Sequence, residues 1–200
     1  MARPKSDDKR NGLVTAATSV IAAQGLGAPT ALIAREASVS NGSLFTYFET
    51  KADLFNQLFL ELKTDMAVAS LAGRAAEAPL REQFRLLWDN WMTWATANPD
   101  KRRVLALLSV SDEITGPTKA AAQRAMAEIA ELVAQARARG PLQDAPAGFA
   151  EAAMNSLAEA TMDFIASDPA RAGEYRQAGF GALCRLLGGP MLGGYFFHVK

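Results

Sequence analysis

The chain has 200 residues, half of them apolar, and its 21 basic side chains balance its 21 acidic ones. A formal net charge of zero argues against a general polyanion binder, because such proteins carry an excess of positive charge. The single cysteine excludes an intrachain disulfide and fits a reducing compartment. Abundant alanine and few β-branched runs favour an all-α fold.

The amino-terminal residues are polar and lack the apolar segment of a signal peptide, and no apolar run is long enough to span a bilayer. We therefore expect a cytoplasmic protein without a membrane partner. Residues 1–9 include Pro4 and are expected to form a mobile arm. This arm is either simply disordered or brings Arg3 and Lys5 to DNA.

A first helix is predicted over residues 9–23, where apolar residues recur at helical spacing between Leu13 and Ile21. Gly25 follows, and glycine readily adopts the backbone conformation that ends a helix. Pro29 suits the start of the next helix, because the first turn does not use the N–H group that proline lacks.

Residues 29–48 predict a helix-turn-helix motif. Small and apolar residues at helical spacing are interrupted by Ser38-Val39-Ser40, a turn signal. Ser40 is expected to cap the next helix by accepting from the N–H of residue 42 or 43. That helix has one apolar stripe, formed by Leu44, Tyr47 and Phe48. It is too short to be stable alone, so it must lie across its neighbour.

This segment resembles the TetR family of one-component transcriptional regulators. The matching residues are Ile33-Ala34, the turn from Ala37 to Ser40, the segment from Gly42 to Phe48, and Lys51 with Leu54. Two positions differ from the family pattern. Ser38 stands where the family usually has glycine, at a cost of about 1 kcal/mol for a left-handed backbone. Phe45 stands where tyrosine is usual, which removes one possible hydroxyl contact to DNA.

The resemblance implies a DNA-binding regulator whose second motif helix enters the major groove. Phosphate contacts are expected from Thr30, Tyr47 and Lys51. Base-edge contacts are expected from Asn41, Ser43 and Thr46. The complete expected DNA-binding set is Thr30, Ser40, Asn41, Gly42, Ser43, Thr46, Tyr47 and Lys51. Because one short helix covers few base pairs, we expect a homodimer on a palindromic operator of double-stranded DNA.

A connecting helix is predicted over about residues 50–71, with Thr50 as its N-cap and Asp53 completing a variant capping box. We place a domain boundary near residue 50, which gives a DNA-binding domain over 1–50 and an effector-binding and dimerisation domain over 51–200. Further helices are expected over about 79–97, 118–139, 149–166 and 169–187, with a short apolar run at 104–108. The total is about nine helices.

The helix over residues 79–97 contains all three tryptophans, on more than one of its sides. It is therefore enclosed, either as plain core or as the wall of a cavity for a small-molecule effector. The expected lining of that cavity is Trp88, Trp91, Met92, Trp94, Asn155, Glu159, Met162, Asp163 and Phe164.

The last two helices carry small residues that allow close helix packing, and in the family they form a four-helix bundle between subunits. The expected dimer interface is Ala153, Ala178, Gly179, Ala182, Leu183 and Leu186. The alternative is that this face is ordinary intrachain core.

Signals for an enzyme are weak. One histidine, His198, and one cysteine, Cys184, form neither a catalytic triad nor a metal cluster, and no cofactor motif is present. The aromatic tail after Pro190 is expected to pack back onto the chain. The sequence thus predicts a ligand-responsive repressor rather than an enzyme. The alternatives are a helical sensor that acts through protein contacts and a small helical enzyme that uses the tryptophan-lined cavity.

Overall fold

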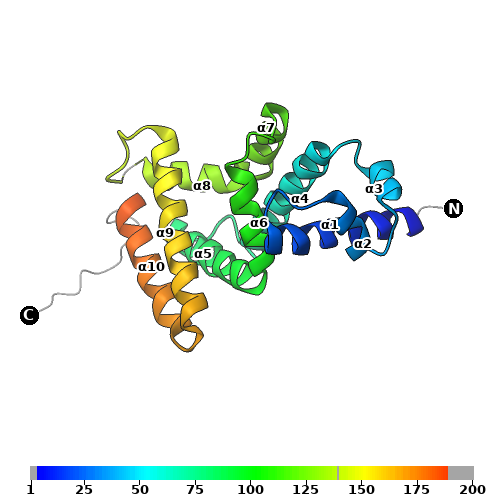
Figure 1. Ribbon diagram of the computed structural model, residues 1–200. Helices are drawn as coiled ribbons and strands as arrows, with labels where there is room; N and C mark the ends of the chain where they lie inside the picture. Colours follow the sequence, from blue (N-terminus) through cyan, green and yellow to red (C-terminus); the bar gives the residue numbers. More distant parts are fainter. Residues whose placement is uncertain (1–3, 139, 189–200) are drawn as a thin grey trace, which may run out of the picture. The chain divides into compact units, whose positions relative to one another are not determined.

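The computed structural model describes residues 4–138 and 140–188, which form helices joined by loops (Figure 1). In chain order the elements are α1 (Pro4–Gln24), α2 (Thr30–Glu36), α3 (Asn41–Tyr47), α4 (Lys51–Leu71), α5 (Leu80–Ala97), α6 (Pro99–Ser109), α7 (Gly116–Ala125), α8 (Ala127–Arg137), α9 (Ala147–Ser167), the 3-10 turn η1 (Pro169–Arg171) and α10 (Ala172–Leu187).

The chain divides into two compact units. The head unit comprises Met1–Asp65 and Asn98–Ala125, and the body unit comprises Met66–Ala97 and Met126–Lys200. Helix α4 therefore begins in the head unit and ends in the body unit. The expected domain boundary near residue 50 stays a prediction.

In the head unit, α1 packs against α2 and α6, and α2 packs against α3 (Figure 1). Leu13 and Ile21 of α1 and Ile33 of α2 are fully buried there. Helix α1 begins at Pro4, so the expected mobile arm over residues 1–9 is wrong for Pro4–Lys9. Arg3 lies outside the described residues.

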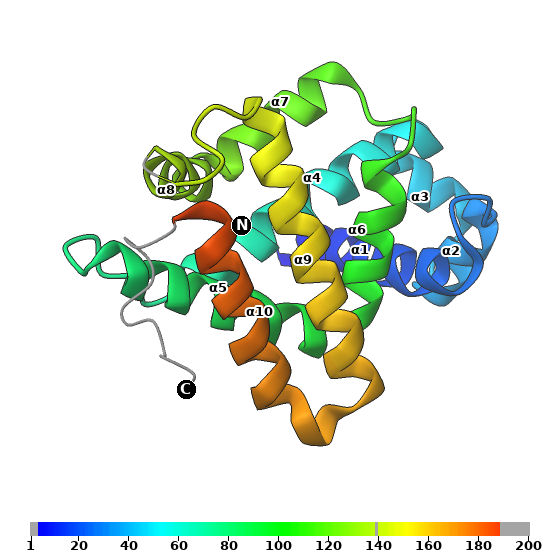
Figure 2. The ribbon, with the colours of Figure 1, turned by 90° about the vertical axis from the view of Figure 1, so that its left-hand side faces the viewer.

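In the body unit, α9 and α10 lie side by side, and α5 packs against both of them (Figure 2). Trp88 of α5 is fully buried. Its indole Nε1 donates to the carbonyl oxygen of Arg176 in α10 at 3.0 Å, and its ring meets Trp91 edge-on at 6.3 Å between centroids. The tryptophan helix thus holds α10 in place by both packing and a hydrogen bond.

Gly179 lies where α10 crosses α5 and α9. A Cβ added at Gly179 would lie 2.5 Å from Thr161 Oγ1 and 2.6 Å from Trp88 Cζ2, so only glycine fits without a shift. Leu183, one turn further along, is also fully buried. The expected place of Gly179 and Leu183 in a dimer interface is therefore wrong, because both are covered by the chain's own helices.

The helix expected over residues 118–139 is broken at Met126 into α7 and α8, which makes ten α-helices rather than nine within the described residues. The two pieces bury their apolar residues in different units. Ala122 of α7 is buried in the head unit, whereas Leu132 and Val133 of α8 are buried in the body unit. No proline or glycine marks the break, so the sequence did not signal it.

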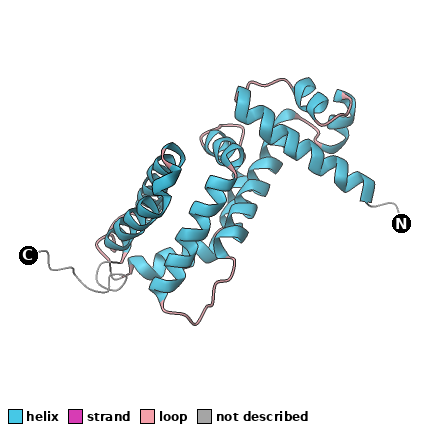
Figure 3. Cartoon of the chain, turned by 90° about the horizontal axis from the view of Figure 1, so that it is seen from below, coloured by secondary structure: helices cyan, strands magenta, loops and turns pink. Residues whose placement is uncertain are grey.

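The predicted all-α fold class is confirmed, since Figure 3 shows helices and loops and no strand within residues 4–138 and 140–188. None of the described helices combines the length and apolar character needed to cross a membrane. The aromatic tail and His198 lie outside the described residues, so the expected packing of the tail stays a prediction.

Candidate nucleic-acid interface

The turn between α2 and α3 has the hydrogen bonds of a Schellman motif. The N–H of Val39 donates to the carbonyl of Ala34 at 2.9 Å, and the N–H of Ser38 donates to that of Arg35 at 3.0 Å. Ser38 has φ of +56° and is the only non-glycine residue in the described segments with a positive φ. The expected left-handed backbone at Ser38 is therefore confirmed, and it sets the angle at which α3 leaves α2.

Ser38→Gly is expected to raise the free energy of unfolding by about 0.5–1 kcal/mol. Relief of the left-handed conformation contributes roughly 1–2 kcal/mol, and the greater freedom of glycine in the unfolded chain offsets part of it. Chemical denaturation followed by circular dichroism measures the change. Ser38→Ala is the matched control, because it removes the hydroxyl but keeps the strained Cβ. An equal gain in both variants would contradict the explanation.

Helix α3 is held at both of its ends. Ser40 caps it as predicted, with its Oγ accepting from the N–H of Ser43 at 3.1 Å. Leu44 and Phe48 are fully buried against the head unit. The helix has only seven residues, so these anchors and not its own hydrogen bonds keep it folded.

The other side of α3 is open to solvent. Asn41, Gly42, Phe45 and Thr46 are exposed, and Ser43 and Tyr47 are half-buried. A Cβ added at Gly42 would meet nothing closer than Ser40 Oγ at 4.0 Å, and the φ of Gly42 is not positive. The protein itself does not require glycine there. Packing within the protein therefore does not explain the glycine, whereas the close approach of a partner to this face would explain it.

The junction between α3 and α4 is organised by Asp53. The N–H of Asp53 donates to Thr50 Oγ1 at 3.0 Å, which confirms Thr50 as the cap of α4. In return, Asp53 Oδ2 accepts from the N–H of Glu49 at 3.0 Å. The predicted capping box is therefore present, with the reciprocal bond made one residue before the cap.

Arg10 joins the start of α1 to this junction, a contact that sequence reasoning missed. Its Nη2 donates to Gln57 Oε1 at 2.8 Å and forms an ion pair with Glu61, and its guanidinium lies 5.6 Å from the ring centroid of Phe48. Gln57 in turn donates to Asp53 at 3.0 Å. The i, i+4 spacing of Gln57 and Glu61 places them on one face of α4, but nothing local identifies a partner some 47 residues away.

The three residues expected to contact phosphates occupy the edges of the motif. Thr30 is the first residue of α2, Tyr47 the last of α3 and Lys51 the first of α4, and all three are half-buried. Lys51 Nζ lies 5.4 Å from the ring centroid of Phe55, so the ring supports this side chain through a cation–π contact.

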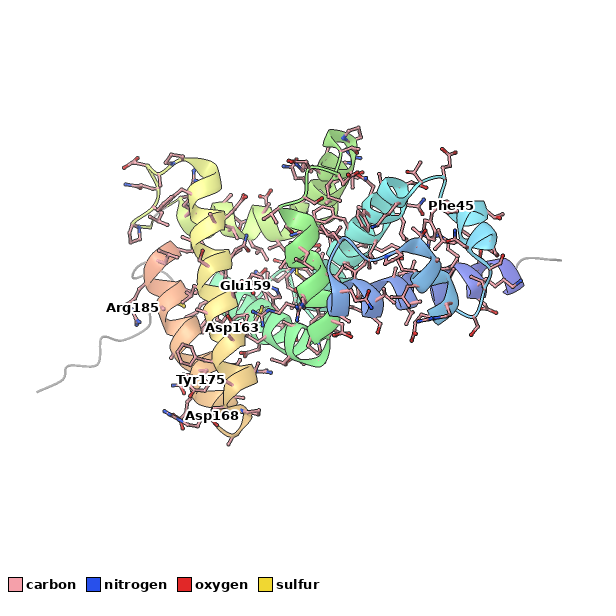
Figure 4. All side chains as sticks on the ribbon, in the orientation of Figure 1. Phe45, Glu159, Asp163, Asp168, Tyr175 and Arg185 are labelled. Carbon is pink, nitrogen blue, oxygen red and sulfur yellow. The ribbon has the colours of Figure 1, made fainter. Side chains whose placement is uncertain are left out.

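The nine residues expected to line an effector cavity fall into two groups. Five are buried in the body unit: Trp88, Trp91, Met92, Trp94 and Met162. The other four, Asn155, Glu159, Asp163 and Phe164, are exposed on α9, where Figure 4 labels Glu159 and Asp163. The expectation of one lining made of all nine is wrong, because the four lie on the face of α9 that the body unit leaves uncovered.

Asn90 of α5 makes hydrogen bonds to the backbone at the carboxyl end of α4. Its Nδ2 donates to the carbonyls of Ser70 and Ala72 at 3.3 and 2.9 Å, so it holds the carboxyl end of α4.

Enzymatic features remain weak in the described part of the chain. Cys184 is buried, and burial raises the pKa of its thiol, which makes it a poor nucleophile. Within residues 4–138 and 140–188 no group of three or more His, Cys, Asp or Glu side chains is arranged to hold a metal ion.

The residues and geometry define an all-helical protein with a helix-turn-helix head. Residues 13–58 match the family model of bacterial regulatory proteins, TetR family. A crystal structure of a TetR family transcription regulator from Shewanella sp. PV-4 is 31% identical, with a TM-score of 0.78 over 88% of this chain and 95% of that one. The chain therefore belongs to the TetR family, which confirms the predicted class of DNA-binding transcriptional regulator.

Two more distant structures share the fold. The TetR family regulator from Marinobacter aquaeolei VT8 is 20% identical, with a TM-score of 0.81 over 92% of this chain and 98% of that one. LfrR from Mycobacterium smegmatis, in complex with proflavine, is 18% identical, with a TM-score of 0.64 over 88% of this chain and 95% of that one.

Proposed function

We propose that the chain is a ligand-responsive repressor that binds a palindromic operator as a homodimer and has no enzymatic activity of its own. The observation that carries this proposal is α3, a helix buried through Leu44 and Phe48 and open to solvent along Asn41, Gly42, Phe45 and Thr46. A helix held in this way can enter a major groove without unfolding its support.

Within this proposal, Thr30, Tyr47 and Lys51 bind phosphates and so set the orientation of the head on the duplex. Asn41, Ser43 and Thr46 contact base edges, and Gly42 permits close approach. Ser40 acts indirectly, because its hydroxyl caps α3.

The proposed dimer uses the exposed sides of α9 and α10. Ala178 is exposed there, and Ala153, Ala182 and Leu186 are half-buried, so small side chains allow a second copy to approach. Phe164 is 58% exposed and lies 5.4 Å from the ring of Tyr175, which adds apolar surface suited to burial between subunits. Figure 4 labels Tyr175 near the end of this helix pair.

The proposed effector binds in the body unit, where the tryptophans of α5 are buried. LfrR, which shares the fold, forms a complex with the small molecule proflavine, and this supports the proposal that the present chain also takes a small-molecule effector. Binding of the effector favours a different arrangement of α4, which runs from the body unit into the head unit. The heads then no longer match two successive major grooves, and operator affinity falls. A coupling free energy of about 1–3 kcal/mol is sufficient.

Selection from a random pool of duplex DNA tests the proposal. The expected product is an inverted repeat whose binding weakens as salt rises. Recovery of a single, unrepeated site would contradict the dimer, and recovery of no site would favour a sensor that acts through protein contacts.

On the selected operator, Tyr47→Phe and Lys51→Ala are each expected to weaken binding roughly tenfold per head while leaving stability almost unchanged, because each removes one contact to a charged phosphate from each head. The loss should be similar across sequences, and Lys51→Ala should lower the salt slope by about 1 per head.

Lys63→Ala is the matched control. Lys63 also lies on α4 over an aromatic ring, 5.8 Å from the centroid of Phe59, but it is roughly 18 Å further along the helix. Equal losses in the Lys51 and Lys63 variants would show that overall charge, and not a phosphate contact at Lys51, explains the effect.

A further inference from the structure

The open face of α3 is less polar than its sequence suggests. Phe45 is 41% exposed, one of five large hydrophobic side chains that are exposed in the described part of the chain. Its neighbour Thr46 donates its hydroxyl to the carbonyl of Gly42 at 3.3 Å. Gly42 itself presents no side chain. The middle of the face therefore consists of a phenyl ring beside a threonine whose hydroxyl is already used as a donor.

The helix cannot turn this ring inward. Leu44 precedes Phe45 and Phe48 follows it by three residues, and both are fully buried. Rotation of α3 that buried Phe45 would expose one of those two side chains and would break the cap at Ser40. The ring therefore stays at the surface, and Figure 4 labels it on α3.

A phenyl ring in a major groove has few favourable contacts, because it neither donates nor accepts a hydrogen bond. Among the four bases only thymine presents an apolar group there, its C5-methyl, and phenylalanine is one of the side chains that contact it. A phenyl ring that covers the donors and acceptors of other base edges would remove their hydrogen bonds to water without replacing them.

We propose that Phe45 contacts the C5-methyl group of a thymine in each operator half-site and so makes that thymine a determinant of sequence preference. The proposal rests on the proposed function, since it requires that α3 enters the major groove. It adds a base identity to that function: one thymine per half-site is recognised through its methyl group.

Deoxyuridine substitution tests the proposal, because it removes the methyl group and leaves base pairing intact. Each thymine of the selected operator is replaced in turn, symmetrically in both half-sites, and binding is measured by gel shift. At one position, affinity for the native protein should fall about fourfold per half-site, the fold-change that corresponds to one buried methyl group.

Phe45→Ala completes a double-mutant cycle. This variant should bind the thymine and deoxyuridine operators equally well at that position, because the ring that senses the methyl group is gone. Val110→Ala, which truncates another exposed apolar residue of the head unit, should keep the full preference for thymine. Thermal unfolding of Phe45→Ala should match that of the native chain, since the ring is not part of the core.

The outcomes separate the two proposals. Specific binding with no deoxyuridine effect at any position, or with the same effect in Phe45→Ala, would overturn the role of Phe45 and leave the repressor proposal standing. A native protein that selects no DNA site would overturn both. A selected half-site without thymine would overturn the methyl contact alone.

Discussion

Phe48→Ala is expected to lower the free energy of unfolding by about 3–5 kcal/mol, the usual range for removing a large buried aromatic side chain. Phe48 is fully buried where α3 ends, and its ring lies beneath the guanidinium of Arg10 at 5.6 Å. Truncation leaves a cavity under α3 and removes the ring contact with Arg10. Denaturation followed by circular dichroism, at one protein concentration, measures the loss.

Phe45→Ala is the control for this prediction, because it removes the same side chain three residues earlier from an exposed site. We expect its unfolding free energy to stay within about 0.5 kcal/mol of the native value. Phe48→Ala should therefore lower stability, whereas Phe45→Ala should change only the DNA preference, because Phe48 is buried and Phe45 is exposed. Similar destabilisation by both would contradict the orientation of α3.

Gly179→Ala is expected to destabilise the chain by about 1–3 kcal/mol, the typical cost of overfilling a packed core. The added methyl group would overlap Thr161 Oγ1 and Trp88 Cζ2. Trp88 cannot easily move away, because its Nε1 donates a hydrogen bond to the carbonyl of Arg176, which lies on the same helix as Gly179. Tryptophan fluorescence measures the transition, since all three tryptophans lie on α5.

Gly181→Ala should have the opposite sign. A Cβ at Gly181 meets only Arg185 Nη1, at an ordinary 3.6 Å, so the substitution mainly improves helix propensity. A gain of up to about 1 kcal/mol is expected. If both alanine variants were stabilising, the close packing of α10 against Trp88 and Thr161 would be wrong.

The capping and turn residues show how far local sequence can be interpreted. The positive φ of Ser38 and the caps at Ser40 and Thr50 follow from short-range hydrogen bonds, which involve residues no more than five positions apart. The same is true of Gly25, whose φ of +77° ends α1 as predicted. These features can be predicted without information about the rest of the chain. The resemblance to the family rests on the same segment, which contains Ser38, Ser40 and Thr50.

The incorrect predictions share a different cause. Gly179 and Leu183 have the small and apolar character of an interface, but the sequence does not say whether another helix of the same chain already covers them. Asn155 and Phe164 were expected to line a cavity together with the tryptophans, yet they are exposed on α9. In both cases residue type was informative, whereas the direction of the side chain depended on which helices meet.

The sequence by itself determined the all-α class, the helix-turn-helix and the family, because caps, turns and helical periodicity are local properties. Only the tertiary structure decided that Arg10 supports the α3–α4 junction, that Met126 divides one expected helix into two, and that Trp88 meets Gly179. Each of these depends on contacts between residues far apart in the chain or on the assignment of neighbouring segments to different packed units. Such contacts depend on how whole helices pack against one another, so the residue pattern of a single helix does not predict them.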